Sequence, residues 1–140
     1  MRAYLLGGLV AVGLMLTAGT AVAHHSFAAE FDANKPVKLT GKVTKIEWTN
    51  PHVWFYFNVK DEKTGEVTNW GAEMGPPHLL QRRGWRRDTL KIGEEVTVSG
   101  SLAKNGSKRL NARQVVMTAT GNRPGDTLDA ASSQGGPSAN

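Results

Sequence analysis

Residues 37–60 read VKLTGKVTKIEWTNPHVWFYFNVK, and this stretch decides the fold. Apolar and polar side chains alternate from Val37 onward, and the phase of the alternation slips near Thr44 and Lys45. Alternation with a period of two is typical of half-buried strands, and a slip of this kind is typical of a β-bulge. Because the alternation resumes after a turn at 49–52, the stretch predicts two strands joined by that turn.

Three further strands and a short helix are predicted downstream. The strands cover 66–74, 94–103 and 109–118, and the helix covers 78–83. Asn105-Gly106, between the last two strands, is the strongest hairpin turn in the chain. Three strands, a helix and two strands follow one another in the OB-fold, so we expect an all-β, five-stranded OB-like barrel with a short helix between strands three and four. A small β-sandwich is the alternative. The expected core centres on Phe55, Phe57, Ile46 and the valines Val96 and Val98.

The first residues predict an export signal. Residues 1–23 carry one positive charge at Arg2, an uncharged apolar stretch and a final Ala-Val-Ala, which fits a signal peptide with an A-x-A cleavage site. A membrane anchor is the alternative, because 5–23 is nearly long enough to span a bilayer. Its four glycines, and the lack of Lys or Arg directly after it, favour export. We therefore expect a periplasmic or secreted protein without a stable membrane anchor.

The remaining chain divides into three parts. An N-terminal arm covers 24–36, with Phe27, Ala28 and Phe31 at helical spacing. The barrel is expected over 37–119. Residues 120–140 contain little apolar material, and this composition predicts a disordered tail.

Composition limits the chemistry that is open to the chain. Its 140 residues include no cysteine and four histidines, and its formal net charge is +5. Disulfides and thiolate metal sites are therefore excluded, and any metal must bind imidazole, amine, carboxylate or thioether groups. Because the chain has neither a cysteine nor a G-x-S-x-G motif to supply a nucleophile, we expect no enzyme.

Cleavage after Ala23 would make His24 the N-terminal residue. A free amine and the Nδ1 atom of the same histidine form a neutral chelating pair that suits Cu(II). Cleavage after Ala21 would instead put His24 in third position, which also chelates copper. His25 or His52 is expected to add a further ligand, with His78 as another candidate. The alternative is that the two histidines merely follow the cleavage site, that His52 caps a turn and that His78 is an ordinary helix residue.

Glu73 and Met74 are further candidate metal ligands, beside Trp70 on the third predicted strand. Alternation places Glu73 on the face opposite Trp70 and Met74. If Val67 marks the inward face, Glu73 points into the barrel, where a bare carboxylate requires a metal or an arginine. If Trp70 marks that face, Glu73 is solvated.

Aromatic and basic side chains predict a binding surface. The aromatic residues are Trp54, Tyr56, Trp70 and Trp85, and the basic residues are Arg82, Arg83, Arg86 and Arg87. An exposed group of this kind marks a partner site. Export, the modest net charge and the position of the arginines on the predicted helix and its exit argue against nucleic acid, so we expect no nucleic-acid partner. An acidic partner, an anionic membrane surface or a solvated face remain.

Four motifs carry a resemblance to a known family: HHSFAAEFD, TGKVTKIEWTNPHVWFYFNV, NWGAEMG and RRGWRRDTLKIGEEVTVSG. The chain resembles, over nearly all of residues 24–118, small exported proteins of Gram-negative bacteria that are classed as a domain of unknown function. The resemblance implies a secreted β-barrel-like domain that begins with two histidines. A looser likeness, of fold and composition only, is to periplasmic copper chaperones of OB topology, which bind Cu(I) with His, Met and Trp.

These observations lead to two main hypotheses. The first is an exported OB-like protein that binds a metal, copper, through an N-terminal histidine. The alternative is a non-enzymatic periplasmic module that binds a peptide, glycan or protein partner through its aromatic and basic surface. Assembly through an edge strand is a third. The sequence leaves the oligomeric state open.

Overall fold

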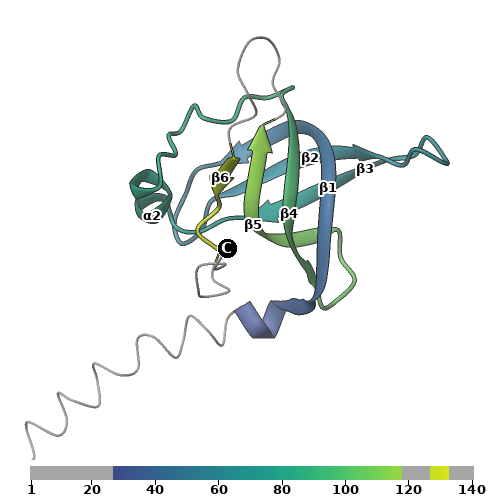
Figure 1. The fold of residues 1–140 in the computed structure, drawn as a ribbon, viewed down its shortest axis with the longest axis horizontal. Coiled ribbons are helices and arrows are strands. Elements are labelled where there is room, and N and C mark those ends of the chain that lie inside the picture. The colour runs from purple at the N-terminus through teal and green to yellow at the C-terminus, as the bar shows by residue number, and fades with distance from the viewer. Residues whose placement is uncertain (1–26, 118–126, 133–140) are drawn as a thin grey trace, which may run out of the picture.

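The protein is built mainly of β-strands (Figure 1). The computed structural model describes residues 27–117 and 127–132. Residues 27–30 form a helical turn. The elements that follow are β1 (Phe31–Glu47), β2 (Trp54–Lys60), β3 (Val67–Glu73), α2 (Pro77–Arg82), β4 (Glu95–Ala103), β5 (Arg109–Met117) and β6 (Thr127–Asp129). The all-β class and the helix between the third and fourth strands are confirmed.

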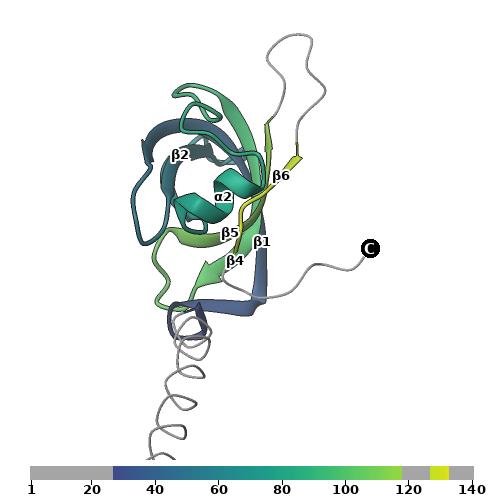
Figure 2. The same cartoon turned by 90° about the vertical axis from the view of Figure 1, so that its left-hand side faces the viewer.

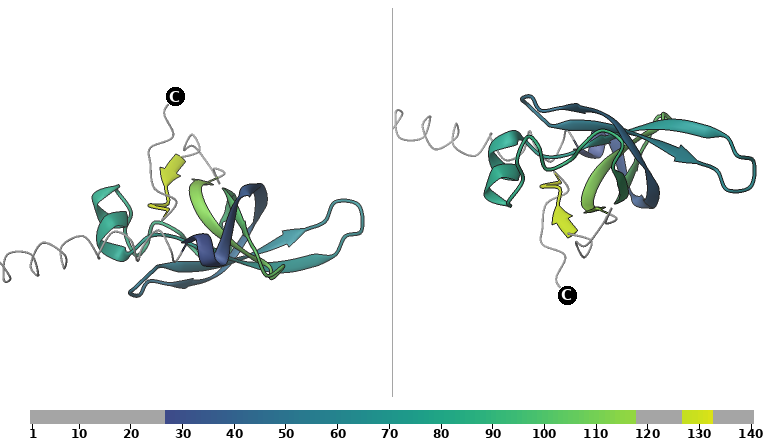
Figure 3. Two further views of the ribbon diagram at one scale, coloured as in Figure 1. Left: turned by 90° about the horizontal axis from the view of Figure 1, so that it is seen from below. Right: turned by 90° about the horizontal axis from the view of Figure 1, so that it is seen from above.

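The strands form one sheet in the order β3-β2-β1-β4-β5-β6, with an additional pairing between β3 and β5. Neighbours in this order are antiparallel, whereas β3 and β5 are parallel. Figure 2 looks onto α2, which lies across one end of the curved strands. The β2–β3 hairpin projects on the side away from α2 (Figure 3).

The first strand is long because it serves two partners. Its C-terminal part pairs with β2 and its N-terminal part pairs with β4. The predicted bulge is confirmed, since the register with β2 shifts between Val43 and Lys45. β1 begins at Phe31, before the alternating pattern starts at Val37. Its register with β4 shifts between Phe31 and Pro36, and this irregularity explains why the alternation does not extend to the start of the strand.

The core lies between the inner faces of these strands. Phe55, Phe57, Val96 and Val98 are fully buried, as predicted, and Ile46 packs against them while partly exposed. Gly41 lets β1 and β2 approach closely, because a Cβ atom there would overlap the backbone carbonyl of Asn58. A residue without a side chain is therefore required at this crossing.

The expectation of a disordered tail over 120–140 is wrong for 127–132. β6 pairs with β5, and Ala130 and Ala131 are buried. The backbone N–H of Gly75 donates to Ala130 O at 2.8 Å, and Ala130 N–H donates to Arg113 O at 2.9 Å. The segment is ordered because its backbone groups and two small side chains find partners in the fold, which composition alone does not reveal.

None of the helices in the described residues is long and apolar enough to cross a membrane.

Candidate metal-binding site around His52 and Glu73

A histidine and a buried carboxylate lie in contact where β2 begins and β3 ends. Nδ1 of His52 is 2.5 Å from Oε1 of Glu73, and the two side chains are 30% and 7% exposed. The backbone holds them together, since Val53 N–H donates to Gly75 O at 3.1 Å and Met74 N–H donates to Val53 O at 2.8 Å. The cis peptide bond between Asn50 and Pro51 lies in the turn before His52.

Burial raises the pKa of Glu73 above its ordinary value. His52 opposes this rise by its charge and its hydrogen bond, and Arg109 opposes it by charge, whereas the carboxylate of Glu30 adds to it. The contact of Nδ1 with Glu73 leaves Nε2 as the ring nitrogen of His52 that does not face this carboxylate. A histidine that donates its other ring N–H to a carboxylate is the usual arrangement around protein-bound metals.

Neither alternative for Glu73 describes its surroundings fully. Val67 is 57% exposed, whereas Trp70 packs against the core, so Trp70 marks the inward face and Glu73 lies on the outer face. Glu73 is nevertheless only 6% exposed. It lies opposite Trp54 in the register of β2 and β3, and its pKa responds to Glu30 of the N-terminal turn and to Arg109 of β5. Distant parts of the chain therefore cover it.

The N-terminal turn docks beside this pair. Phe27 and Phe31 stack with ring centroids 5.8 Å apart and are buried together with Ala103. Trp54 packs against this small cluster, and Lys104 N–H donates to Glu30 O at 2.8 Å. The two phenylalanines thus pack together, although only Phe27 lies in the helical turn and Phe31 begins β1. His24 and His25 lie outside the described residues.

Two other predicted ligands are placed elsewhere. Met74 is 1% exposed and packs in the main hydrophobic core, so it is a core residue rather than a candidate ligand. His78 is exposed in the first turn of α2. Within 27–117 and 127–132, no three His, Cys, Asp or Glu side chains are grouped so that they would hold a metal ion.

Only part of the predicted aromatic surface exists as one surface. Trp54 and Tyr56 lie on the outer face of β2 and stack with centroids 6.5 Å apart. The Arg109 guanidinium lies 5.4 Å from the Trp54 ring centroid, and Lys45 Nζ lies 5.4 Å from that of Tyr56. Lys45 is also paired with Glu47 at 2.5 Å, and the Tyr56 hydroxyl donates to the same carboxylate at 3.3 Å, so this aromatic surface carries both basic and acidic groups.

The other two tryptophans do not belong to it. Trp85 is 1% exposed, and its indole N–H donates to Asp129 O at 2.8 Å, so its prediction as a surface residue is wrong. Trp70 lies on the inward face, with Lys108 Nζ 5.3 Å from its ring centroid. A sequence pattern does not show that β6 supplies a carbonyl for Trp85.

The predicted arginines are exposed on α2 and on the loop after it: Arg82, Arg83, Arg86 and Arg87. Arg83 forms an ion pair with Asp129. They are thus on different elements from Trp54 and Tyr56. Sequence reasoning missed the cations that do accompany these rings, Lys45 and Arg109, because no local pattern shows that Arg109 lies opposite Gly71 across the parallel pairing of β3 and β5.

A family model described as a family of unknown function, DUF6152, matches residues 11–112. The chain belongs to this family. The DUF6152 match includes the candidate residues from His24 to Arg109 and ends within β5, before β6. No curated protein matches the chain. The expected membership of a family of unknown function is therefore confirmed.

Proposed function

We propose that this DUF6152 protein is exported and binds copper at its N-terminus. The amine and Nδ1 of His24, exposed by cleavage after Ala23, bind Cu(II) together with Nε2 of His52. Glu73 is not a ligand in this proposal; it orients the His52 ring. The result is a site of three nitrogen atoms, a donor set that suits tetragonal Cu(II).

The observation that carries the proposal is the contact between His52 and Glu73. Burying a carboxylate such as Glu73 is unfavourable. His52 is partly exposed and could form its hydrogen bonds with water, so its own stability does not require a buried partner. Its position at 2.5 Å from Nδ1 fixes the ring and directs Nε2 away from the carboxylate. A hydrogen bond from the other ring nitrogen to a carboxylate also raises the basicity of a histidine ligand.

Docking of the N-terminal turn supports the proposal further. Phe27 packs in the cluster that also contacts Trp54, the register partner of Glu73. Only His25 and Ser26 lie between His24 and Phe27, so the Cα atoms of His24 and Phe27 are at most about 11 Å apart when the chain is extended. A ligand on the N-terminal residue is therefore within reach of the His52 side of the molecule, and no long loop needs to be ordered when the metal binds.

The fold that would carry this site is a five-stranded OB-like barrel. Three features support it: β1 pairs with both β2 and β4, β3 pairs with β5, and α2 lies between β3 and β4. Closing the order β1-β2-β3-β5-β4 on itself would satisfy both edges of the sheet.

Metal titration of the mature, untagged protein tests the proposal. Mass spectrometry first establishes whether the exported chain begins at His24. We expect wild-type protein to bind one Cu(II) at micromolar concentration or tighter, and His52→Ala to weaken binding at least about tenfold, the loss expected from one ligand. His78→Ala is the matched control and should bind as the wild type does. A mature chain that starts elsewhere, or equal binding by His52→Ala and wild type, contradicts the proposal.

The second candidate function is a partner-binding module, favoured by the stack of Trp54 and Tyr56. The Arg109 guanidinium lies over the Trp54 ring, so this end of the surface suits an acidic peptide, an acidic glycan or an acidic protein patch. Titration with an acidic peptide should change the fluorescence of wild-type protein but not that of Trp54→Ala. Titration with copper and no peptide separates the two candidates, because a metal at His52 would quench nearby Trp54 whether or not a partner is present.

A further inference from the structure

A second surface of the molecule is covered by the C-terminal segment, residues 127–132. The segment lies between α2 and β5 (Figures 1 and 2), and its strand β6 pairs antiparallel with residues 114–116 of β5. The DUF6152 match ends at residue 112, before the segment. Because β6 is the last strand in the order of the sheet, β5 would be an edge strand without it. The segment thus completes an edge that a free strand could also pair with.

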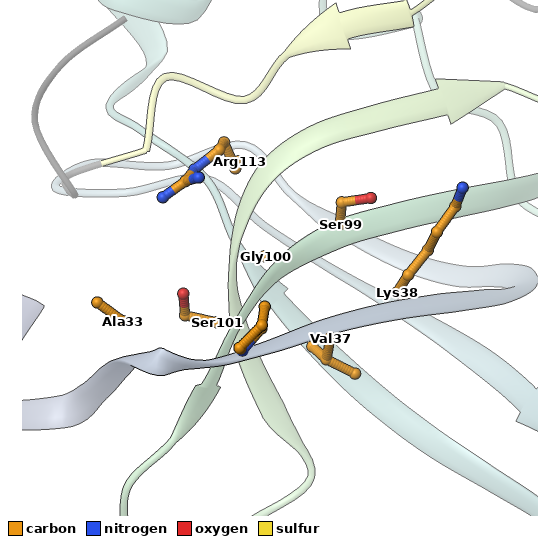
Figure 4. Close-up of a pocket in the computed structure, with 8 residues that line it drawn as sticks. Ala33, Val37, Lys38, Ser99, Gly100, Ser101 and Arg113 are labelled. Carbon is orange, nitrogen blue, oxygen red and sulfur yellow. The ribbon is translucent and has the colours of Figure 1, made fainter. Parts of the chain in front are cut away.

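The segment is held largely through its backbone. Gly75 N–H donates to Ala130 O at 2.8 Å, and Ala130 N–H donates to Arg113 O at 2.9 Å. Trp85 donates its indole N–H to Asp129 O at 2.8 Å. Figure 4 shows the Arg113 side chain beside an open cavity over β1 and β4, whereas it is the Arg113 backbone that accepts from the segment. Backbone hydrogen bonds are open to any extended segment, so they give affinity without selecting a sequence.

Two small side chains decide which sequence fits this surface. Ala130 is fully buried, and Ala131 is 4% exposed. A Cβ atom on Gly75 would overlap the carbonyl and the side chain of Ala131, so the two backbones are in close contact. Arg83 adds an ion pair with the Asp129 side chain. The acceptor surface, which we define as the edge of β5 with Gly75 and Trp85, therefore fits an extended segment in which an acidic residue precedes two alanines.

The docked segment also carries local strain. Ala131 has a backbone φ of 49°, in the left-handed region, and its N–H donates to Oδ1 of Asp129 at 2.7 Å. This conformation is unfavourable for an alanine and persists only where surrounding contacts hold it. The strain lowers the free energy needed to release the segment from its own chain.

We propose that the acceptor surface also takes residues 127–132 of a second copy of the chain, so that two copies exchange their C-terminal segments. The structure shows that this sequence fits, and every copy carries it. An exchanged segment makes the same contacts as one docked in its own chain, which makes exchange a low-cost route to a dimer. Residues 118–126 can span about 30 Å when extended, about the diameter of a small domain, so the covalent link does not confine the segment to its own chain.

Two complementary variants of the full mature chain test the exchange. Ala131→Arg disables the segment, because the buried position has no room for the side chain, but it keeps the acceptor surface. Gly75→Ala blocks the acceptor surface but keeps the segment. We expect each variant alone to sediment as a monomer and an equimolar mixture to form a heterodimer at about 0.1 mM of each chain. This concentration is below the millimolar effective concentration of a segment held in its own chain.

Asn34→Arg is the matched control for the added charge, since Asn34 is exposed. Its own segment stays docked, so its mixture with Gly75→Ala should remain monomeric. A synthetic peptide of residues 127–132 should dissociate the heterodimer, whereas the same peptide with the Ala131→Arg change should not.

A mixture of Ala131→Arg and Gly75→Ala that stays monomeric, or a heterodimer that the peptide does not dissociate, overturns the proposal. Peptide binding by Ala131→Arg without a heterodimer also overturns it and assigns the surface to a different partner. If Ala131→Arg does not fold alone, circular dichroism of the mixture decides: recovery of the sheet signal supports exchange, and no recovery overturns it. Ala131→Arg keeps His52 and Glu73, so its copper binding tests the proposed function separately.

Discussion

Trp85 donates its indole N–H to the backbone carbonyl of Asp129 at 2.8 Å, and this contact joins the loop after α2 to β6. The tryptophan is among the largest fully buried side chains of the described residues. Asp129 also accepts from Ala131 N–H at 2.7 Å and pairs with Arg83. One short C-terminal segment thus contacts β5, the end of β3 and the loop after α2.

Trp85→Phe should destabilise the protein by about 1–3 kcal/mol, because it leaves the Asp129 carbonyl without its donor and leaves part of the indole volume empty. Urea unfolding followed by circular dichroism measures this free energy. Arg83→Ala removes only the exposed ion pair with the same residue and should cost about 0–1 kcal/mol. Equal effects of the two substitutions would show that β6 is held by charge and not by the buried indole.

Gly41→Ala should destabilise the fold far more than Gly71→Ala. A Cβ atom at Gly41 would overlap the backbone of Asn58, which only a backbone shift relieves. At Gly71 the nearest atom is Cε1 of the Tyr56 side chain at 3.2 Å, which can move by rotation. We expect a loss of more than about 3 kcal/mol for Gly41→Ala and about 1 kcal/mol or less for Gly71→Ala. Thermal unfolding measures the stability of both variants, and equal midpoints for Gly41→Ala and Gly71→Ala would contradict the predicted difference.

Glu73→Gln should change how stability depends on pH. Because the pKa of Glu73 is raised in the folded protein, its contribution is fully present below the ordinary carboxyl pKa and is lost as the pH rises through the raised pKa. The wild type should therefore lose stability relative to Glu73→Gln as the pH rises above the ordinary carboxyl pKa of about 4.3. Unfolding midpoints across this range measure the difference.

Glu47→Gln is the control of opposite sign for that experiment. The hydrogen bond from Lys45 lowers the pKa of Glu47, so its contribution is present above the ordinary carboxyl pKa and is lost as the pH falls. The wild type should lose stability relative to Glu47→Gln on the acid side. If both variants shift the profile in the same direction, burial does not govern Glu73.

Phe27→Ala should weaken copper binding without removing a proposed ligand. Phe27 anchors the N-terminal turn through Phe31, and its cluster is separate from the main core. Without this anchor the N-terminal turn would be less ordered, and metal binding would then have to order it at a cost in conformational entropy. We expect at least about a fivefold weaker Cu(II) affinity while the main unfolding transition is nearly unchanged, because few core contacts are lost. Ala29→Ser, on the exposed side of the same turn, should leave the copper affinity as it is in the wild type.

Local patterns predicted most of the fold. The slip at Thr44 and Lys45 located the bulge of β1, and Asn105-Gly106 located the β4–β5 hairpin, because each signal depends only on neighbouring residues. The burial of Glu73 was not predictable in this way. It depends on the N-terminal turn and on Arg109, which alternation along β3 does not reveal.

The same limit explains the errors on Trp85 and the tail. The hydrogen-bond partner of Trp85 is 44 residues away, and an aromatic residue between arginines has the composition of a surface site. Residues 127–132 contain one large apolar side chain, Leu128, and are ordered chiefly by backbone pairing with β5. Composition measures apolar content but not the number of backbone partners that a segment finds.

The two-partner strand β1 also has a kinetic consequence. Its pairing with β2 closes a short hairpin, whereas its pairing with β4 joins distant residues, such as Thr40 and Thr97, whose hydroxyls are 2.8 Å apart across a separation of 57 residues. Such non-local pairings raise the contact order and slow folding. The N-terminal half of β1 can therefore pair only after β4 is in place. A chain that ends before residue 95 could form the β1–β2–β3 meander, but the edge of β1 that pairs with β4 would remain unpaired.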